Sequence, residues 1–196
     1  MARSFPPFDL HRLLTTVFDP QPGERFAIMI DLDDPRDVKD FRFLNNPALS
    51  IQRYAHDLFY KGLQDCPFVA YRTTGGSNLD LPDTATTPEG REISLTRDFY
   101  PNLDIVLCIS TYSATAPLTA LAKQYGFRGA TMHGLNQVIL ETGLSVDYNE
   151  VSREAERLRQ LMTRADRFEI QFEVAGKKLV LTIECNRQDA QKSHGL

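Results

Sequence analysis

The stretch Arg25-Phe-Ala-Ile-Met-Ile-Asp-Leu32 decides the fold, because it is a nearly continuous apolar run of strand length. A strand with one face in water alternates apolar and polar residues. A continuous apolar run instead suits a strand that is covered on both faces. We therefore predict that this stretch is the first central strand of a sheet lying between two layers of helices.

Strand and helix patterns alternate on both sides of this stretch. Further strands are predicted at residues 68–73, 103–110 and 127–132, and helices at residues 10–18, 47–64 and 117–125. The alternation predicts an α/β fold with a doubly wound, mostly parallel sheet centred on residues 26–32 and 104–110. Asn46 and Pro47 are expected to begin the second helix, and Gly126 to end the third.

Two other segments have different patterns. Residues 74–91 are rich in Gly, Pro, Thr and Asp, which predicts a long irregular loop. After residue 145, Asp147 and Glu150 have the spacing of a helix capping box, and an apolar helical stripe then runs to about Ala165. A hairpin is predicted next, with strands at residues 167–174 and 178–184 and a tight turn at Ala175-Gly176.

These patterns predict two parts. Residues 1–145 are expected to form a Rossmann-like α/β domain, and residues 146–196 a helix plus a β-hairpin that begins a second layer or domain. The final residues 188–196 are polar and contain no predicted element that would complete such a layer.

Composition excludes several classes of protein. The formal net charge is −4, from 22 Lys and Arg against 26 Asp and Glu, so no basic surface indicates binding to nucleic acid or an anionic membrane. No apolar run is long enough to span a bilayer, and the first residues lack the apolar core of a signal peptide. Cys66, Cys108 and Cys185 are far apart, which is typical of buried reduced thiols and predicts a cytoplasmic location.

An acidic motif directly follows the central strand. Asp31 and Asp33 form an Asp-x-Asp pattern, which resembles the nucleophile and general acid that haloacid-dehalogenase-type phosphatases place around Mg²⁺. Ser110 or Thr111, and then Lys123, resemble the second and third motifs of that family. A proline stands at the fifth motif position, and no strand-terminal Asp-Asp pair follows. A solvated acidic turn is therefore the alternative interpretation.

Gly75 and Gly76 follow the second predicted strand, where their backbone amides could form an anion-binding nest. The Lys of a P-loop is absent, so an ordinary flexible loop is the alternative. His133 follows a later strand, and ligands bind at strand ends in open α/β sheets. A loop histidine without a function is the alternative for His133.

No metal ligand is predicted in this chain, because His11, His56, His133 and His194 lack metal-site spacing to one another or to a cysteine. A stand-alone α/β module that binds a small ligand is one candidate function. Its ligand would lie near residues 74–78 or 111–116, at the ends of strands.

Several segments together carry a family resemblance: Pro22-Gly-Glu24 leading into a strand, then residues 113–118, 128–132, 147–148 and 164–166, and the hairpin containing Gly176. In this order they resemble the amino-terminal domain of the aminopeptidase T type of metallopeptidase. That family builds a two-metal site from Glu, His, Tyr and Asp residues of a carboxy-terminal domain, so no metal ligand is carried over to this sequence. A ring-cleaving dioxygenase acting on dihydroxypyridine has the same scaffold and is an alternative within the resemblance.

The resemblance implies that this chain is the amino-terminal, non-metal-binding part of a metallo-aminopeptidase-like enzyme. Divalent metal ions would be held by the longer protein, and this chain alone is expected to be inactive. A hairpin with one uncovered face is marginally stable by itself. Phe168, Ile170 and Phe172 are therefore expected to be covered by a carboxy-terminal catalytic domain or by a second copy in a homodimer.

Overall fold

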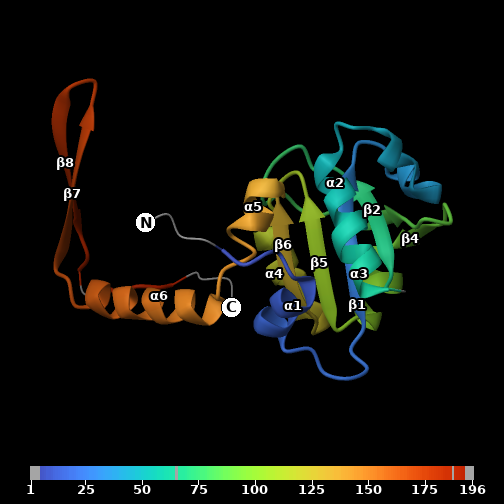
Figure 1. Ribbon diagram of the computed structural model, residues 1–196, viewed down its shortest axis with the longest axis horizontal. Helices are drawn as coiled ribbons and strands as arrows, with labels where there is room; N and C mark the ends of the chain where they lie inside the picture. The colour runs from blue at the N-terminus through green and yellow to red at the C-terminus, as the bar shows by residue number, and fades with distance from the viewer. Residues whose placement is uncertain (1–4, 65, 187, 193–196) are drawn as a thin grey trace. The chain divides into compact units, whose positions relative to one another are not determined.

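The computed structural model describes residues 5–64, 66–186 and 188–192. It divides into two compact units, one up to Ser145 and the other from Val146 (Figure 1). Unit 1 is a mostly parallel sheet with helices on both faces, and unit 2 is a helix followed by an antiparallel hairpin. The predicted α/β fold class, a doubly wound sheet with an appended helix and hairpin, is confirmed.

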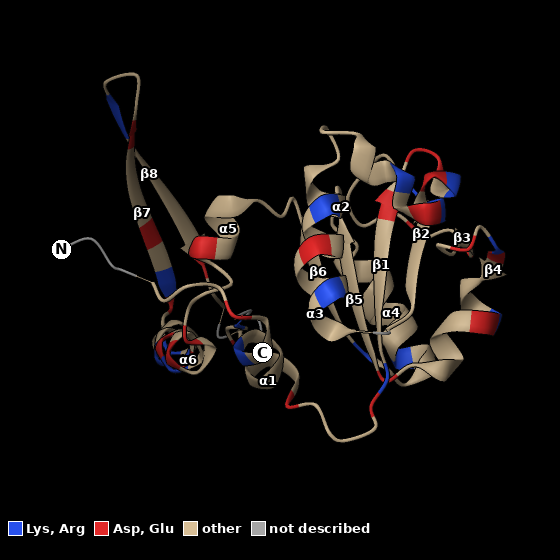
Figure 2. Ribbon diagram, turned by 45° about the vertical axis from the view of Figure 1, so that its right-hand side comes forward, with Lys and Arg blue, Asp and Glu red and all other residues tan. Residues whose placement is uncertain are grey.

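The sheet of unit 1 has the strand order β4-β3-β2-β1-β5-β6. Its strands are β1 (Phe26–Leu32), β2 (Phe68–Arg72), β3 (Thr84–Thr86), β4 (Glu92–Ser94), β5 (Ile105–Ser110) and β6 (Arg128–His133). β1 pairs in parallel with β2 and with β5, and β5 pairs in parallel with β6. All residues of β1 after Phe26 are buried, as the continuous apolar run predicts. The central strands β1, β2 and β5 carry charge only near the ends of β1 and β2, at Asp31 and Arg72 (Figure 2).

Helical segments cover this sheet on both faces. They are α1 (Leu10–Phe18), η1 (Pro35–Asn45), α2 (Ser50–Tyr54), η2 (Ala55–Tyr60), α3 (Lys61–Leu63), η3 (Leu95–Phe99), η4 (Tyr100–Asn102), α4 (Thr115–Tyr125) and α5 (Gln137–Glu141). In Figure 1, α1, α2 and α3 lie over one face, whereas α4 lies over the other. Gly126 ends α4 with a φ of 81°, in the left-handed region that glycine adopts without strain.

One face of the sheet packs into a large apolar cluster. Met29 and Cys108, from β1 and β5, are fully buried there against Phe99 and Leu118. The cluster joins the central strands to η3 and α4. It therefore holds these two helical segments against the sheet.

The predicted irregular loop over residues 74–91 is wrong in part. β3 lies within it and pairs antiparallel with β2, with Ala85 opposite Tyr71. β4 then pairs with β3. Strands of three residues are too short to show an alternating pattern, and their position depends on pairing with a distant segment.

The predicted start of the second helix is also wrong. Asn46 accepts a hydrogen bond from the Ala48 amide at 3.0 Å, which forms a local Asx turn, and the helix begins only at Ser50. Before it, the acidic segment after β1 is a kinked 3-10 helix, in which Asp40 and Phe41 have positive φ angles of 50° and 52°.

Unit 2 consists of α6 (Tyr148–Thr163), β7 (Arg167–Val174) and β8 (Lys177–Glu184). The Asp147 carboxylate accepts from the amides of Asn149 and Glu150 at 2.9 and 3.2 Å, so the predicted helix start is confirmed. Ala175 and Gly176 have φ angles of 51° and 75°, as a two-residue hairpin turn requires.

Unit 2 has no buried core, because none of the described residues of α6, β7 and β8 is buried. The strand register places apolar side chains opposite one another, for example Ile170 opposite Leu181 and Phe172 opposite Leu179. We call this set the apolar hairpin face: Phe168, Ile170, Phe172, Val174, Leu179, Leu181 and Ile183. All of them except Phe168 are between 43% and 55% exposed. No helix in the described residues is long and apolar enough to cross a membrane.

Candidate functional site

The order of strands reverses beside β1, where the chain first forms β2 on one side and later β5 on the other. Ligands of open α/β sheets bind outside the carboxyl ends of the strands at such a switch point. Asp31 lies near the end of β1, while Thr73 and Thr111 directly follow β2 and β5. The sequence predictions Asp31 and Thr111 are therefore brought together at the place that this rule indicates.

The Asp31 side chain is 2% exposed and forms the centre of a hydrogen-bond network. Its Oδ1 accepts from Gln52 Nε2 at 2.8 Å, from the Thr111 amide at 2.9 Å and from Thr111 Oγ1 at 3.2 Å. Its Oδ2 accepts from Thr73 Oγ1 at 3.2 Å. The carboxylate thus links three strand ends to α2, and a nucleophilic role would require one of its oxygens to leave this network.

Asp33 lies outside this network. It is exposed, and its backbone carbonyl accepts from Arg72 Nη1 at 2.7 Å. The next residue, Asp34, caps η1 and pairs with Arg36 at 2.7 Å. The hydrogen bonds from Arg36 lower the pKa of Asp34 to about 2. Asp34 forms the local hydrogen bonds that the acidic-turn interpretation expects, whereas Asp31 is buried and does not lie in a solvated turn.

The loop with Gly75 and Gly76 packs against the loop that follows Thr111. The Asn78 amide donates to the Ser113 carbonyl at 2.6 Å, and Asn78 Oδ1 accepts from the Ala116 amide at 3.0 Å. Gly75 has a φ of 73°, which favours glycine at this turn. Asn78 therefore bonds to the first turn of α4, whose own N-cap, Ala114, has no side chain that can accept a hydrogen bond. This role depends on a contact between distant loops, and no local pattern indicated it.

The remaining phosphatase-like and ligand-like residues are more scattered. His133 ends β6 opposite Ser110 and is exposed. Lys123 is exposed and lines a hollow of about 340 Å³ together with Phe127 and Arg128. Arg128 is the first residue of β6, whereas Thr111 follows Ser110, which pairs with the last residue of β6. The hollow therefore extends to the amino end of β6, away from Thr111.

No group of three or more His, Cys, Asp or Glu side chains in the described part of the chain is placed to hold a metal ion. His56 lies against the ring of Phe41, with centroids 4.7 Å apart, and its Nδ1 is 2.9 Å from the Asp57 carboxylate. The Cys108 thiol is buried, which raises its pKa to about 11. His194 lies outside the described residues.

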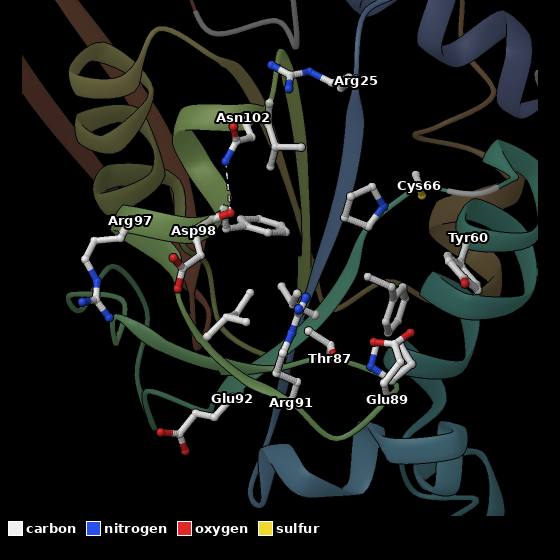
Figure 3. A pocket seen from close by; sticks show the side chains of 17 residues that line it. Arg25, Tyr60, Cys66, Thr87, Glu89, Arg91, Glu92, Arg97, Asp98 and Asn102 are labelled. Atoms are coloured by element: carbon white, nitrogen blue, oxygen red, sulfur yellow. Dashed lines mark hydrogen bonds between the residues drawn. The ribbon is translucent and has the colours of Figure 1, made fainter.

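A larger hollow lies near the amino ends of β1 and β2. We call it the β3–β4 cleft, and its volume is about 1120 Å³ (Figure 3). Residues 67–69 and the β3–β4 connection line it, together with parts of η3 and η4. The sequence analysis assigned no function to these residues, because the segments that form the cleft are adjacent only in the folded chain.

Comparisons with protein-family models, with curated proteins and with solved structures found no match for this chain.

Proposed function

We propose that this chain is the amino-terminal, non-metal-binding part of a metallo-aminopeptidase-like enzyme. In this proposal a carboxy-terminal domain binds divalent metal ions and hydrolyses the first peptide bond of its substrate, and the whole enzyme is cytoplasmic. The segments that resemble the aminopeptidase T type of metallopeptidase support this assignment. The observation that carries it is the apolar hairpin face of unit 2, which gives this chain a surface for a large apolar partner.

The size of that surface is consistent with a protein partner. A large apolar side chain presents roughly 200 Å² when fully exposed, so the apolar hairpin face offers on the order of 500 Å². At about 25 cal/mol per Å², covering it would contribute up to about 12 kcal/mol before the costs of association. Stable interfaces bury about 800 Å² on each partner, so the contact must extend beyond this face.

Helix α6 offers the extension that such a contact needs. Leu158 and Leu161 are each 58% exposed on it, and Val151 is 37% exposed. A helix and a two-stranded hairpin without buried side chains gain most of their stability from whatever covers them. Unit 2 is therefore best explained as a docking element, and we propose that the metal-binding catalytic domain is what it docks to.

The test uses the 196-residue protein and the isolated catalytic domain of an aminopeptidase T type enzyme. Titration calorimetry should detect binding between them, and Phe172→Asp should weaken it at least tenfold, because a charge would enter the apolar contact. Gln171→Asp is the matched control, because Gln171 lies on the opposite face of the same strand. It should leave the affinity unchanged.

Aminopeptidase turnover with divalent metal is expected only when the catalytic domain is present. Turnover by this chain alone, or equal effects of the two hairpin substitutions, would contradict the proposal. Analytical ultracentrifugation provides a further test, because it measures the oligomeric state of this chain. A homodimer of this chain that Phe172→Asp dissociates would show that a second copy, rather than the catalytic domain, covers the hairpin.

A Mg²⁺-dependent phosphatase acting through Asp31 and Asp33 is the second candidate, favoured by the position of Asp31 at the switch point. Turnover of p-nitrophenyl phosphate with Mg²⁺, abolished by Asp31→Asn, would establish it in place of our proposal. We expect no turnover, because both carboxylate oxygens of Asp31 already accept hydrogen bonds from the protein.

A further inference from the structure

The β3–β4 cleft combines an apolar floor with charges of both signs. Val69, at the start of β2, forms part of its floor together with Phe99 from η3, whereas the ring of the neighbouring Phe68 stacks on Phe43 on the other face of the sheet. Figure 3 shows Thr87 between the side chains of Glu89 and Arg91, all three from the connection between β3 and β4. A cation, an anion and an apolar surface therefore lie close together in one hollow.

Thr87 supplies an unusual group in this hollow. Its side chain is 7% exposed, and its Oγ1 is buried without a hydrogen-bond partner in the described structure. The hydroxyl is near enough to Glu89 to be the first cause of the lowered pKa of that carboxyl, but it makes no hydrogen bond of proper geometry. Buried hydroxyls normally have a partner, so this one indicates a polar group that the cleft receives.

The two charges beside Thr87 are also open to a ligand. Glu89 and Arg91 form no ion pair within 4.0 Å among the described residues, although Arg91 is near enough to contribute to the lowered pKa of Glu89. Two other charges of the cleft are already engaged. Arg25 pairs with Asp104 at 3.4 Å, and the Asp98 carboxylate accepts from the Ser94 amide at 2.9 Å.

We propose that the β3–β4 cleft binds a zwitterion with an apolar side chain, namely an apolar α-amino acid or a short peptide that begins with one. Arg91 would hold its carboxylate, because a guanidinium matches a carboxylate with two parallel hydrogen bonds. Glu89 would hold its ammonium group, Thr87 Oγ1 would bond to its polar end, and the side chain would lie on Val69 and Phe99.

The size of the cleft fits this class of ligand. Its volume of about 1120 Å³ lies just above the range of small-ligand pockets, which span roughly 300–1,000 Å³. A single amino acid would leave space for further residues, so a peptide is included in the proposal. The cleft is formed by unit 1 alone, and this inference stands whether or not unit 2 docks to a catalytic domain.

The test is a titration of the ¹⁵N-labelled 196-residue protein, followed by NMR. L-leucine and Leu-Leu are the zwitterionic probes. 4-Methylpentanoate is leucine without the ammonium group, and 3-methylbutylamine is leucine without the carboxylate. A zwitterion should shift the amide signals of residues 87–93 and 97–103, and the two singly charged analogues should bind at least tenfold more weakly. A stronger response to Leu-Leu would identify the peptide as the better ligand.

Substitutions test each contact separately. Arg91→Gln and Glu89→Gln should each weaken binding at least tenfold, whereas Glu92→Gln is the control, because Glu92 points away from Thr87 in Figure 3. Thr87→Val keeps the shape of the side chain and should weaken binding several-fold without lowering the melting temperature of the free protein. The inference is overturned by equal binding of the singly charged analogues, by shifts confined to other residues, or by no shift at millimolar leucine.

Discussion

Replacement of Asp31 by alanine should destabilise unit 1 strongly, because it removes the acceptor of four hydrogen bonds at the switch point. The Thr111 amide and the Thr73 hydroxyl would lose this partner. A buried donor left without a partner costs about 1–3 kcal/mol, but Thr111 is exposed and Thr73 half-buried, so water can replace part of their lost bonds and we expect a total of about 2–4 kcal/mol. Gln52 limits the loss, because its amide also donates to the Asp31 carbonyl at 3.0 Å.

Asp31→Asn should have a much smaller effect. Its remaining carbonyl oxygen can still accept from Gln52 and Thr111, and its new amide can donate to the Thr73 hydroxyl. We therefore expect Asp31→Asn to lower the free energy of unfolding by about 1 kcal/mol, and Asp31→Ala to lower it by several times that amount. Asp33→Asn is the control and should stay within about 0.5 kcal/mol of the parent, because Asp33 is exposed.

Urea denaturation followed by far-UV circular dichroism measures these differences, and tyrosine fluorescence follows the seven tyrosines of a chain that has no tryptophan. For a protein of this size, each kcal/mol shifts the melting temperature by roughly 2–4 °C, so Asp31→Ala should melt about 10 °C lower. Equal stability of the Ala variant and the parent would refute the reasoning, since the network would then contribute nothing.

Three further outcomes are expected. Val106→Asp should lower the free energy of unfolding by more than about 4 kcal/mol, because it buries an unpaired charge in β5. Leu79→Asp is the control and should melt like the parent, because the Leu79 side chain is 52% exposed. Similar melting temperatures for the two variants would show that β5 is not part of the core. The pKa of Glu156 is lowered to about 2, chiefly by its hydrogen bond with Arg159. The ionised Glu156 therefore stabilises α6 above a pH of about 4.5, and this stabilisation is lost as the pH falls towards 2. In Glu156→Gln, the helix content should change less with pH over that window than in the parent. The same pH dependence in both proteins would contradict this prediction. Cys108 should resist thiol reagents at neutral pH until urea unfolds the protein, because burial raises its pKa to about 11; rapid labelling of the folded protein would show that the thiol is accessible.

Sequence patterns were sufficient where the physical cause is local or where burial is complete. The run from Phe26 to Leu32 is apolar because β1 is covered on both faces, and helix α1 has the predicted bounds Leu10–Phe18. Asp147 and Gly126 were also identified correctly, because a helix end depends on only a few neighbouring residues.

Features that depend on distant contacts could not be predicted in this way. β3 is a strand only because Ala85 and Thr86 pair with β2, and the hydrogen bond between Asn78 and the start of α4 crosses 38 residues. The candidate residue Asp31 was identified from its motif, but its hydrogen bonds to Gln52, Thr73 and Thr111 follow from the fold. The β3–β4 cleft left no signal in the sequence, since its charges and its floor come from separate segments.

The lack of buried side chains in unit 2 has a thermodynamic consequence for the docking proposed above. A partner that covers α6 and the hairpin would bury apolar surface and would also restrict side chains that are now in water, so part of the gross binding energy is lost to ordering. Association should therefore show a large negative heat-capacity change together with a modest affinity for the area involved. Under the docking proposed above, the same exposed surface is accessible to chaperones and proteases until a partner covers it, so the abundance of this chain in a cell should follow the supply of that partner.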